Sequence, residues 1–323
     1  MRYILARDIG GTSCSAMLVR EDGMLIGSGQ CDVTDPASGR SVVGSGRSPE
    51  SIRTASLRAF GNSRCDELVI VNGMDDSNEY ADFAGTVSRS YVSEAQAALA
   101  LAGERCGIVV LAGTGAFVYG ETRDGRICHL DSLGPILGDY GSGYYIGHLA
   151  LRAAARSGWG DRHRTSLREA IYAACGVDMA TERVIGSGLE PFSLMNPDRA
   201  EIASFAQIVD REAEAGDRIA VEILKTAASA IAETLRDVVD ALEIGDQEYP
   251  MVGTGGVVHS RIYWQHLSGL ATEIAPGLKP FVSNLPAVVG VALASLQKFG
   301  SCDPQVTADN LIRSITERNS VIA

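Results

Sequence analysis

Three short glycine-rich segments each follow an apolar run, and their residue types suit the binding of an anion. They are Asp8-Ile-Gly-Gly-Thr-Ser13, Ala112-Gly-Thr-Gly115 and Gly253-Thr-Gly-Gly256. Glycine lets backbone N–H groups approach a phosphate closely because no Cβ stands in the way, and the Thr and Ser hydroxyls add donors. The Asp8 carboxylate is suited to hold Mg²⁺, usually through water. None of the segments has the Walker sequence, so the indication of phosphate binding comes from their repetition in one chain.

A fourth segment, residues 134–147, places several glycines around Asp139 and opens a predicted helix. Glycines in this density indicate a backbone that packs closely against a ligand or against another strand. The alternative is a strained loop that only connects two elements.

The elements that carry the first two segments are predicted to be a duplicated unit. Residues 3–9, 15–20 and 24–29 are predicted strands, and residues 108–111, 116–119 and 126–129 repeat the pattern. Four residues recur at a constant distance of 102 positions: Gly11, Thr12, Asp22 and Gly23 match Gly113, Thr114, Asp124 and Gly125. We interpret this as an internal duplication of a strand–glycine loop–strand–turn–strand unit, the alternative being two unrelated hairpins.

Strands and helices alternate over the rest of the chain, which predicts an α/β protein. Helices are predicted over residues 49–60, 93–102, 144–156, 166–174, 201–214, 218–242 and 307–318. Ser93 and Gln96 form the capping-box pattern at the start of the second of these helices.

Composition excludes several classes of protein. The 323 residues are 46% hydrophobic and 21% charged, with a net charge of −12, which disfavours nucleic acid as a partner. The longest apolar run, residues 286–296, is too short to span a membrane, and charge appears too early in the chain for a signal peptide. The seven cysteines are scattered without a C-x-x-C spacing. They predict reduced thiols in a cytoplasmic protein.

Taken together, four motifs resemble the N-acetylglucosamine kinase and BadF/BadG-type ATPase family, within the superfold that sugar kinases share with heat-shock ATPases and actin. The motifs are Asp8-x-Gly-Gly-Thr, Ala112-Gly-Thr-Gly, Leu137-Gly-Asp-x-Gly-Ser-Gly-Tyr and Gly255-Gly-Val. The resemblance implies two ribonuclease-H-like domains around a central cleft. The first would cover residues 1–104 and the second residues 105–299, with a helix at about 300–323 packing back on the first.

The resemblance also implies ATP with Mg²⁺, an amino sugar as the small-molecule substrate, and a homodimer. It assigns the first phosphate loop to Asp8, Gly10, Gly11, Thr12 and Ser13, with Asp8 as the metal residue. It assigns the second phosphate loop to Gly113, Thr114 and Gly115, and the adenosine loop to Gly255 and Gly256. Thr114, Gly115 and Asp139 would also contact the sugar.

This sequence departs from the family pattern in the sugar site. The usual tryptophan before the fourth segment is Leu133, and the usual acid after Gly-Asp is Tyr140. The asparagine of the substrate loop is not evident, so Ser48 or Arg47 would stand in for it. The implied activity is therefore that of an N-acetylglucosamine- or glucosamine-kinase-like enzyme, and these departures leave the identity of its sugar substrate open.

The family's catalytic aspartate is matched here by Glu94, in Ser93-Glu94-Ala95. Glu94 would supply the carboxylate that phosphoryl transfer needs, and this carboxylate would accept the proton of the sugar hydroxyl. The alternative is that Glu94 only complements the positive end of its helix dipole. A non-catalytic homologue that binds nucleotide or sugar is thus a second hypothesis. An activator ATPase with an iron–sulfur cluster is a weaker third, because the cysteines offer no matching pair.

Overall fold

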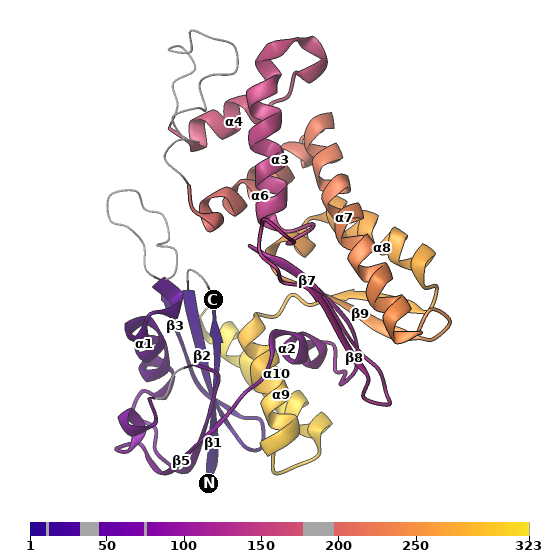
Figure 1. Cartoon of the computed structure of the whole chain (residues 1–323). Helices are drawn as coiled ribbons and strands as arrows, with labels where there is room; N and C mark the ends of the chain where they lie inside the picture. The colour runs from indigo at the N-terminus through magenta and orange to yellow at the C-terminus, as the bar shows by residue number, and fades with distance from the viewer. Residues whose placement is uncertain (11–12, 33–44, 74–75, 177–196, 323) are drawn as a thin grey trace. The chain divides into compact units, whose positions relative to one another are not determined.

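The computed structural model describes residues 1–10, 13–32, 45–73, 76–176 and 197–322. The chain divides into two compact units, residues 1–105 with 283–323 and residues 106–282. Each unit is built on a five-stranded mixed sheet with helices packed against it (Figure 1), which confirms the predicted α/β class. We call them unit 1 and unit 2.

The sheet of unit 1 has the order β3-β2-β1-β4-β5. Its strands are β1 (Arg2–Ile9), β2 (Ser13–Arg20), β3 (Leu25–Asp32), β4 (Cys65–Val71) and β5 (Ala84–Ser90). β1, β2 and β3 are antiparallel neighbours, whereas β1, β4 and β5 run parallel. Parallel neighbours require crossover connections. The connection from β3 to β4 contains α1 (Pro49–Phe60), and the connection from β4 to β5 contains the 3-10 turn η2 (Ser77–Tyr80).

Alternate residues of β1 enter two different hydrophobic cores, as the pleat of a strand requires. Tyr3 and Leu5 belong to the core that also contains Phe60 of α1. Ile4 and Ala6 pack on the other face, in the core that contains residues of α2 (Glu94–Leu101), α9 (Ala287–Phe299) and α10 (Pro304–Ile322). Figure 1 shows α1 on one side of this sheet and α9 with α10 on the other.

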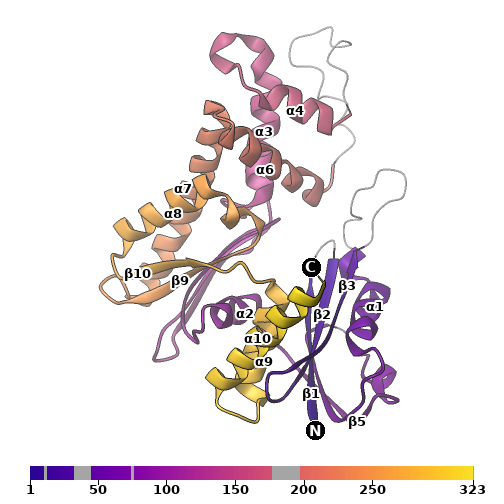
Figure 2. The same cartoon turned by 180° about the vertical axis from the view of Figure 1, so that it is seen from behind.

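The second unit repeats the first. Its sheet has the order β10-β9-β6-β7-β8, with β6 (Gly107–Ala112), β7 (Ala116–Glu121) and β8 (Ile127–Asp131) antiparallel. β6, β9 (Tyr249–Thr254) and β10 (Leu278–Val282) are parallel, and Figure 2 shows β9 and β10 side by side. Strand order and direction therefore match unit 1 strand for strand, which supports the internal duplication over the alternative of unrelated hairpins.

Helices of unit 2 enclose a single large core. They are α3 (Gly143–Arg156), α4 (Leu167–Ala174), α6 (Arg199–Glu214), α7 (Arg218–Leu242) and α8 (Arg261–Ile274), with the 3-10 turns η3 (Ser157–Trp159), η4 (Asp161–His163) and η6 (Gly256–His259). α7 presents a continuous apolar stripe that includes Ala228, Leu235 and Leu242 to this core. Within the described ranges, no helix combines the length and apolarity needed to cross a bilayer.

The division of the chain differs from the expected boundary at residues 283–299. These residues, which include α9, were expected in the second domain, but they group with unit 1. The reason is the apolar face of α9, whose Val289, Ala292 and Leu296 are buried in the core that β1 and α2 line. α10 groups with unit 1 as well, and Asn310 of α10 donates to the Asp22 carbonyl oxygen at 2.8 Å.

Candidate active site

The first glycine turn joins β1 to β2 in unit 1. The Gly10 amide donates to the carbonyl oxygen of Ser13 at 2.9 Å, while Gly11 and Thr12 lie outside the described residues. Gly46, in the 3-10 turn η1 (Ser45–Arg47), lies directly against this turn, because a Cβ there would overlap the backbone of Ser13 and the carbonyl oxygen of Gly10. The segment after β3 is thus brought to the glycine turn.

Ser48 follows η1 and begins α1. Its hydroxyl oxygen accepts a hydrogen bond from the Ser51 amide at 3.1 Å and lies 2.9 Å from the Ser51 hydroxyl oxygen. Ser48 is therefore an N-cap, a structural role that satisfies one orphan amide of the helix. The side chain of Arg47 is exposed beside it.

Asp8 and Glu94 form a pair of like charges in unit 1. Asp8 is half-buried near the end of β1, and Glu94 is the exposed first residue of α2. Burial raises the pKa of the Asp8 carboxyl, and the nearby charge of Glu94 raises it further. Ser93 and Gln96 close the predicted capping box at 3.1 and 3.0 Å, which fixes where α2 begins and therefore where Glu94 stands.

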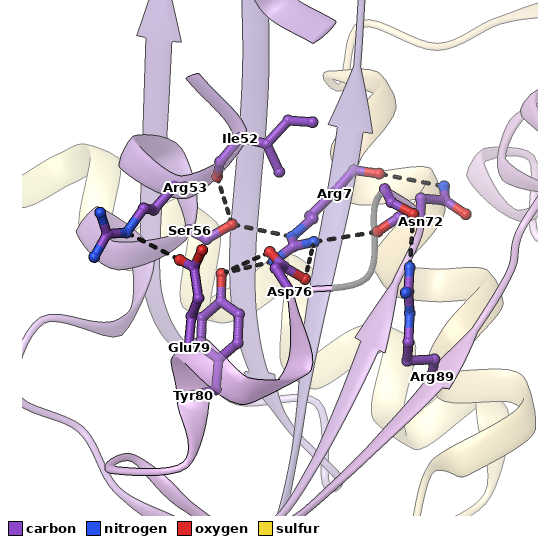
Figure 3. Close-up of polar contacts among 10 residues, drawn as sticks. Arg7, Ile52, Arg53, Ser56, Asn72, Asp76, Glu79, Tyr80 and Arg89 are labelled. Carbon is purple, nitrogen blue, oxygen red and sulfur yellow. Dashed lines mark hydrogen bonds and ion pairs between the residues drawn. The ribbon is translucent and has the colours of Figure 1, made fainter. Parts of the chain in front are cut away.

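Arg7, the residue before Asp8, is the centre of a buried polar network (Figure 3) that the sequence analysis did not single out. Arg7 is fully buried, and its Nη1 and Nη2 lie 3.2 and 2.6 Å from the two carboxylate oxygens of Asp76. Nε donates to the Ser56 hydroxyl at 3.0 Å, and Nη2 donates to the Tyr80 hydroxyl at 2.6 Å. The signal in the sequence was a second charged residue, Arg7, beside Asp8 in the mostly apolar run of β1.

Asn72 connects this network to the segment that carries Glu94. Its side-chain amide donates to the Arg7 carbonyl oxygen at 3.3 Å and its side-chain oxygen accepts from the Val92 amide at 3.0 Å. Asn72 adopts a left-handed backbone conformation with φ 65°, which Asn tolerates better than most residues. The backbone of Arg7, next to Asp8, and the backbone of Val92, two residues before Glu94, are therefore held by one side chain.

The second glycine turn joins β6 to β7 in unit 2 and is anchored on α3. The Gly113 amide donates to the Gly115 carbonyl oxygen at 2.9 Å. The first two amides of α3, those of Gly143 and Tyr144, donate to the carbonyl oxygens of Gly113 and Thr114 at 2.7 and 3.4 Å. All three carbonyl oxygens of the turn are thus engaged within unit 2.

Asp139 is a buried residue that binds the end of this turn. It is 2% exposed and has φ 59°. One carboxylate oxygen accepts from the Ala116 amide at 3.0 Å, and the other accepts from Nη2 of Arg199. Sequence reasoning missed Arg199, which begins α6 far along the chain from Asp139.

Asp131 shapes the loop that leads to Asp139. Its carboxylate accepts from the amides of Asp139 and Tyr140 at 2.7 and 3.1 Å. Leu133, at the position of the family tryptophan, has 63% of its surface exposed.

The third glycine segment lies beside the second turn. Gly255 has φ 92°, and a Cβ there would overlap the backbone of Ala112 and Gly113. This close approach follows from the parallel pairing of β6 with β9, which brings the ends of both strands to one edge of the sheet. Gly256, the first residue of η6, has open space around it.

The structure therefore gathers the predicted residues in two groups. Asp8, Gly10, Ser13 and Glu94 belong to unit 1, as does Ser48. Gly113, Thr114, Gly115, Asp139, Gly255 and Gly256 lie together in unit 2.

Two curated kinases are similar to this chain in sequence. The N-acetylmuramic acid/N-acetylglucosamine kinase of Clostridium acetobutylicum is 28% identical over 223 residues, covering 69% of this chain and 71% of that protein. The N-acetyl-D-glucosamine kinase of Dictyostelium discoideum is 29% identical over 196 residues, covering 60% of each chain.

A solved structure has the same fold. It is a candidate N-acetylglucosamine kinase from Chromobacterium violaceum, with a TM-score of 0.62 and 20% identity, and the alignment covers 92% of this chain and 99% of that one. The family model for BadF/BadG/BcrA/BcrD ATPases matches residues 8–295, a span that begins at Asp8 and includes all three glycine segments. This chain belongs to the BadF/BadG/BcrA/BcrD ATPase family.

Proposed function

We propose that this protein transfers a phosphoryl group from ATP to an amino sugar, as an N-acetylglucosamine- or glucosamine-kinase-like enzyme. The observation that carries the proposal is the Asp8–Glu94 pair beside the first glycine turn. A carboxylate whose pKa is raised by burial and, further, by a second carboxylate is typical of a functional site. The family membership and the two similar kinases give the reaction class.

The three glycine segments are the proposed nucleotide-binding residues of this chain. Gly10, Gly11, Thr12 and Ser13 form the first phosphate loop, Gly113, Thr114 and Gly115 the second, and Gly255 with Gly256 the adenosine loop. Contact between Gly255 and Gly113 supports a single nucleotide site in unit 2 for the last two segments.

Mg²⁺ fits the donor set at Asp8. Oxygen ligands suit this hard cation, which proteins commonly hold with one or two carboxylates and the phosphates of the substrate. A cation bound at Asp8 would offset the repulsion between the Asp8 and Glu94 carboxylates. Bound Mg²⁺ would supply neutralisation of phosphate charge.

Glu94 is proposed as the general base. The sugar hydroxyl oxygen attacks the γ-phosphorus, the bond from that phosphorus to the β–γ bridging oxygen breaks, and ADP leaves. The hydroxyl proton passes to the Glu94 carboxylate, which is exposed and has its place fixed by the capping box. Ser48, Thr114, Gly115 and Asp139 are the proposed sugar contacts, with Asp139 acting mainly on the shape of the turn because both its oxygens are bonded.

The test is a coupled ADP-release assay with MgATP across amino sugars and neutral hexoses. We expect turnover with N-acetylglucosamine or glucosamine, and a Glu94→Gln variant slowed about 100-fold or more, in line with the usual 10²–10⁴-fold contribution of a general base. Its MgATP affinity by calorimetry should be unchanged. Glu104→Gln, an exposed acid just after the same helix, is the matched control.

Binding of MgATP without turnover on any sugar would instead establish the non-catalytic homologue. A homodimer and a cytoplasmic location stay predictions, and light scattering on the purified chain tests the first.

A further inference from the structure

Arg199 lies directly over the second glycine turn. A Cβ on Gly115 would overlap both the Arg199 guanidinium and the Asp139 carboxylate, so the absence of a side chain at Gly115 makes room for this pair. The two partners differ sharply in exposure, since 42% of the Arg199 side chain is accessible but only 2% of the Asp139 side chain. The outward-facing charge at this turn is therefore the guanidinium.

Both carboxylate oxygens of Asp139 already accept hydrogen bonds from groups of the protein. The amide of Ala116 holds one oxygen at 3.0 Å, and Arg199 holds the other. Asp139 accepts a hydrogen bond from Nη2 of Arg199, and the planar guanidinium has further N–H donors that this bond does not use.

The polarity of the turn favours an anion at the same place. The carbonyl oxygens of Gly113, Thr114 and Gly115 all accept hydrogen bonds from within unit 2, so their negative ends are turned toward those donors. An approaching anion consequently meets a guanidinium above a turn whose carbonyl groups are already engaged.

We propose that Arg199 is the oxyanion-binding residue at the second glycine turn. The oxyanion is a phosphate group of the nucleotide or a carboxylate carried by the sugar, two sources with the same chemistry for a guanidinium. The proposal extends the proposed kinase function, and the experiment below separates the two.

The experiment compares Arg199→Gln with Arg199→Lys in the full chain. Calorimetric titrations use three probes: pyrophosphate, N-acetylmuramic acid, which carries a carboxylate, and N-acetylglucosamine, which does not. Arg218→Gln is the matched control, because Arg218 is also the exposed first residue of a long helix and pairs with Glu222 at 2.6 Å.

If the nucleotide supplies the oxyanion, Arg199→Gln weakens pyrophosphate binding about 10- to 100-fold, the range expected for a hydrogen bond to a charged group. The KM for MgATP then rises with every sugar. If the sugar supplies it, only N-acetylmuramic acid loses affinity. In either case Arg199→Lys retains part of the binding, since it keeps the charge but loses the fork, and Arg218→Gln matches the wild type.

Arg199→Gln leaves Asp139 buried without its cation, and this could impair folding. The double variant Arg199→Gln with Asp139→Asn removes both charges and keeps a neutral partner for the turn. Equal affinity of this folded double variant and the wild type for all three probes would overturn the proposal, as would a wild type that binds none of them. ADP release bears on the kinase function alone, since probe binding can depend on Arg199 without any turnover.

Discussion

Arg7 and Asp76 form a buried two-point ion pair that joins the end of β1 to the segment after β4 (Figure 3). Both are charged residues with little or no exposure, at 0% and 5% of their side-chain surfaces. Tyr80 and Ser56 add hydrogen bonds to Arg7, so the charge is well compensated. Arg7 directly precedes Asp8, so the pair anchors the backbone beside that carboxylate to the segment after β4.

Asp76→Asn should destabilise unit 1 strongly. Removal of one partner of a buried ion pair leaves an uncompensated charge and typically costs about 3–5 kcal/mol. Urea unfolding measures the loss. The neighbouring surface pair Arg53–Glu79 is a control from the same region, with 62% and 42% of the side chains exposed. Glu79→Gln should cost less than about 1 kcal/mol, and equal losses in both variants would contradict the role of burial.

Asn72→Gly should slow turnover with a small effect on the fold. Glycine keeps the left-handed conformation at this position but loses both side-chain bonds, to the Arg7 carbonyl oxygen and to the Val92 amide. Because these bonds hold the backbones next to Asp8 and Glu94, a shift of about 1 Å could cost about 100-fold in kcat. Steady-state kinetics on amino sugars measures it, and an unchanged kcat would show that the bridge is dispensable.

Asp8→Asn should raise the stability of the ligand-free protein near neutral pH. The raised pKa of Asp8 means that the folded state binds its proton more tightly than the unfolded chain does. The stability of the wild type therefore falls as pH rises from the unfolded pKa through the folded pKa, and the loss persists above it.

Thermal unfolding of both proteins between pH 3 and pH 7 tests this expectation. The melting-temperature difference should grow in favour of Asp8→Asn as pH rises, and then level off. Added Mg²⁺ should stabilise the wild type more than the variant, and EDTA should reverse that gain. A wild type that is the more stable protein at pH 7 without metal would refute the expectation.

Gly115→Ala should act like Arg199→Gln. The new Cβ occupies space held by the guanidinium and the Asp139 carboxylate, so Arg199 must leave its partner. Overpacking of this kind typically costs about 1–3 kcal/mol, and we expect a weaker affinity for pyrophosphate as well. Gly269→Ala in α8 is the control, because nothing lies within 4 Å of its added Cβ. If the Gly115 variant binds pyrophosphate as tightly as this control, the steric argument fails.

Local patterns predicted much of the fold. The 102-residue repeat predicted the three antiparallel strands that both sheets share, and the Ser93–Gln96 pattern located the start of α2. β5 was missed because its residues are mostly exposed and polar, so it lacks the alternation of a half-buried strand. α9 was assigned to the wrong unit because its partners, β1 and α2, are far away in sequence.

The same limit applies to the site. The glycine segments and Asp8 were recognised by residue type and spacing, and Glu94 by the family resemblance. Arg199 and Arg7 were not recognised, because the role of each depends on a carboxylate that lies 60 or 69 residues away along the chain. Only the packing of α6 on α3, and of the segment after β4 on β1, brings those charges together.

Unit 1 is assembled from two stretches of chain with the whole of unit 2 between them. On the ribosome, residues 106–282 emerge as one continuous stretch, whereas one face of β1 waits for α9 and α10 to be translated. Until then Ile4, Val69 and Val71 lack the apolar side chains of α9 and α10 that complete their core. A ribosome that stalls before residue 283 has therefore synthesised the whole of unit 2, whereas unit 1 still lacks α9 and α10.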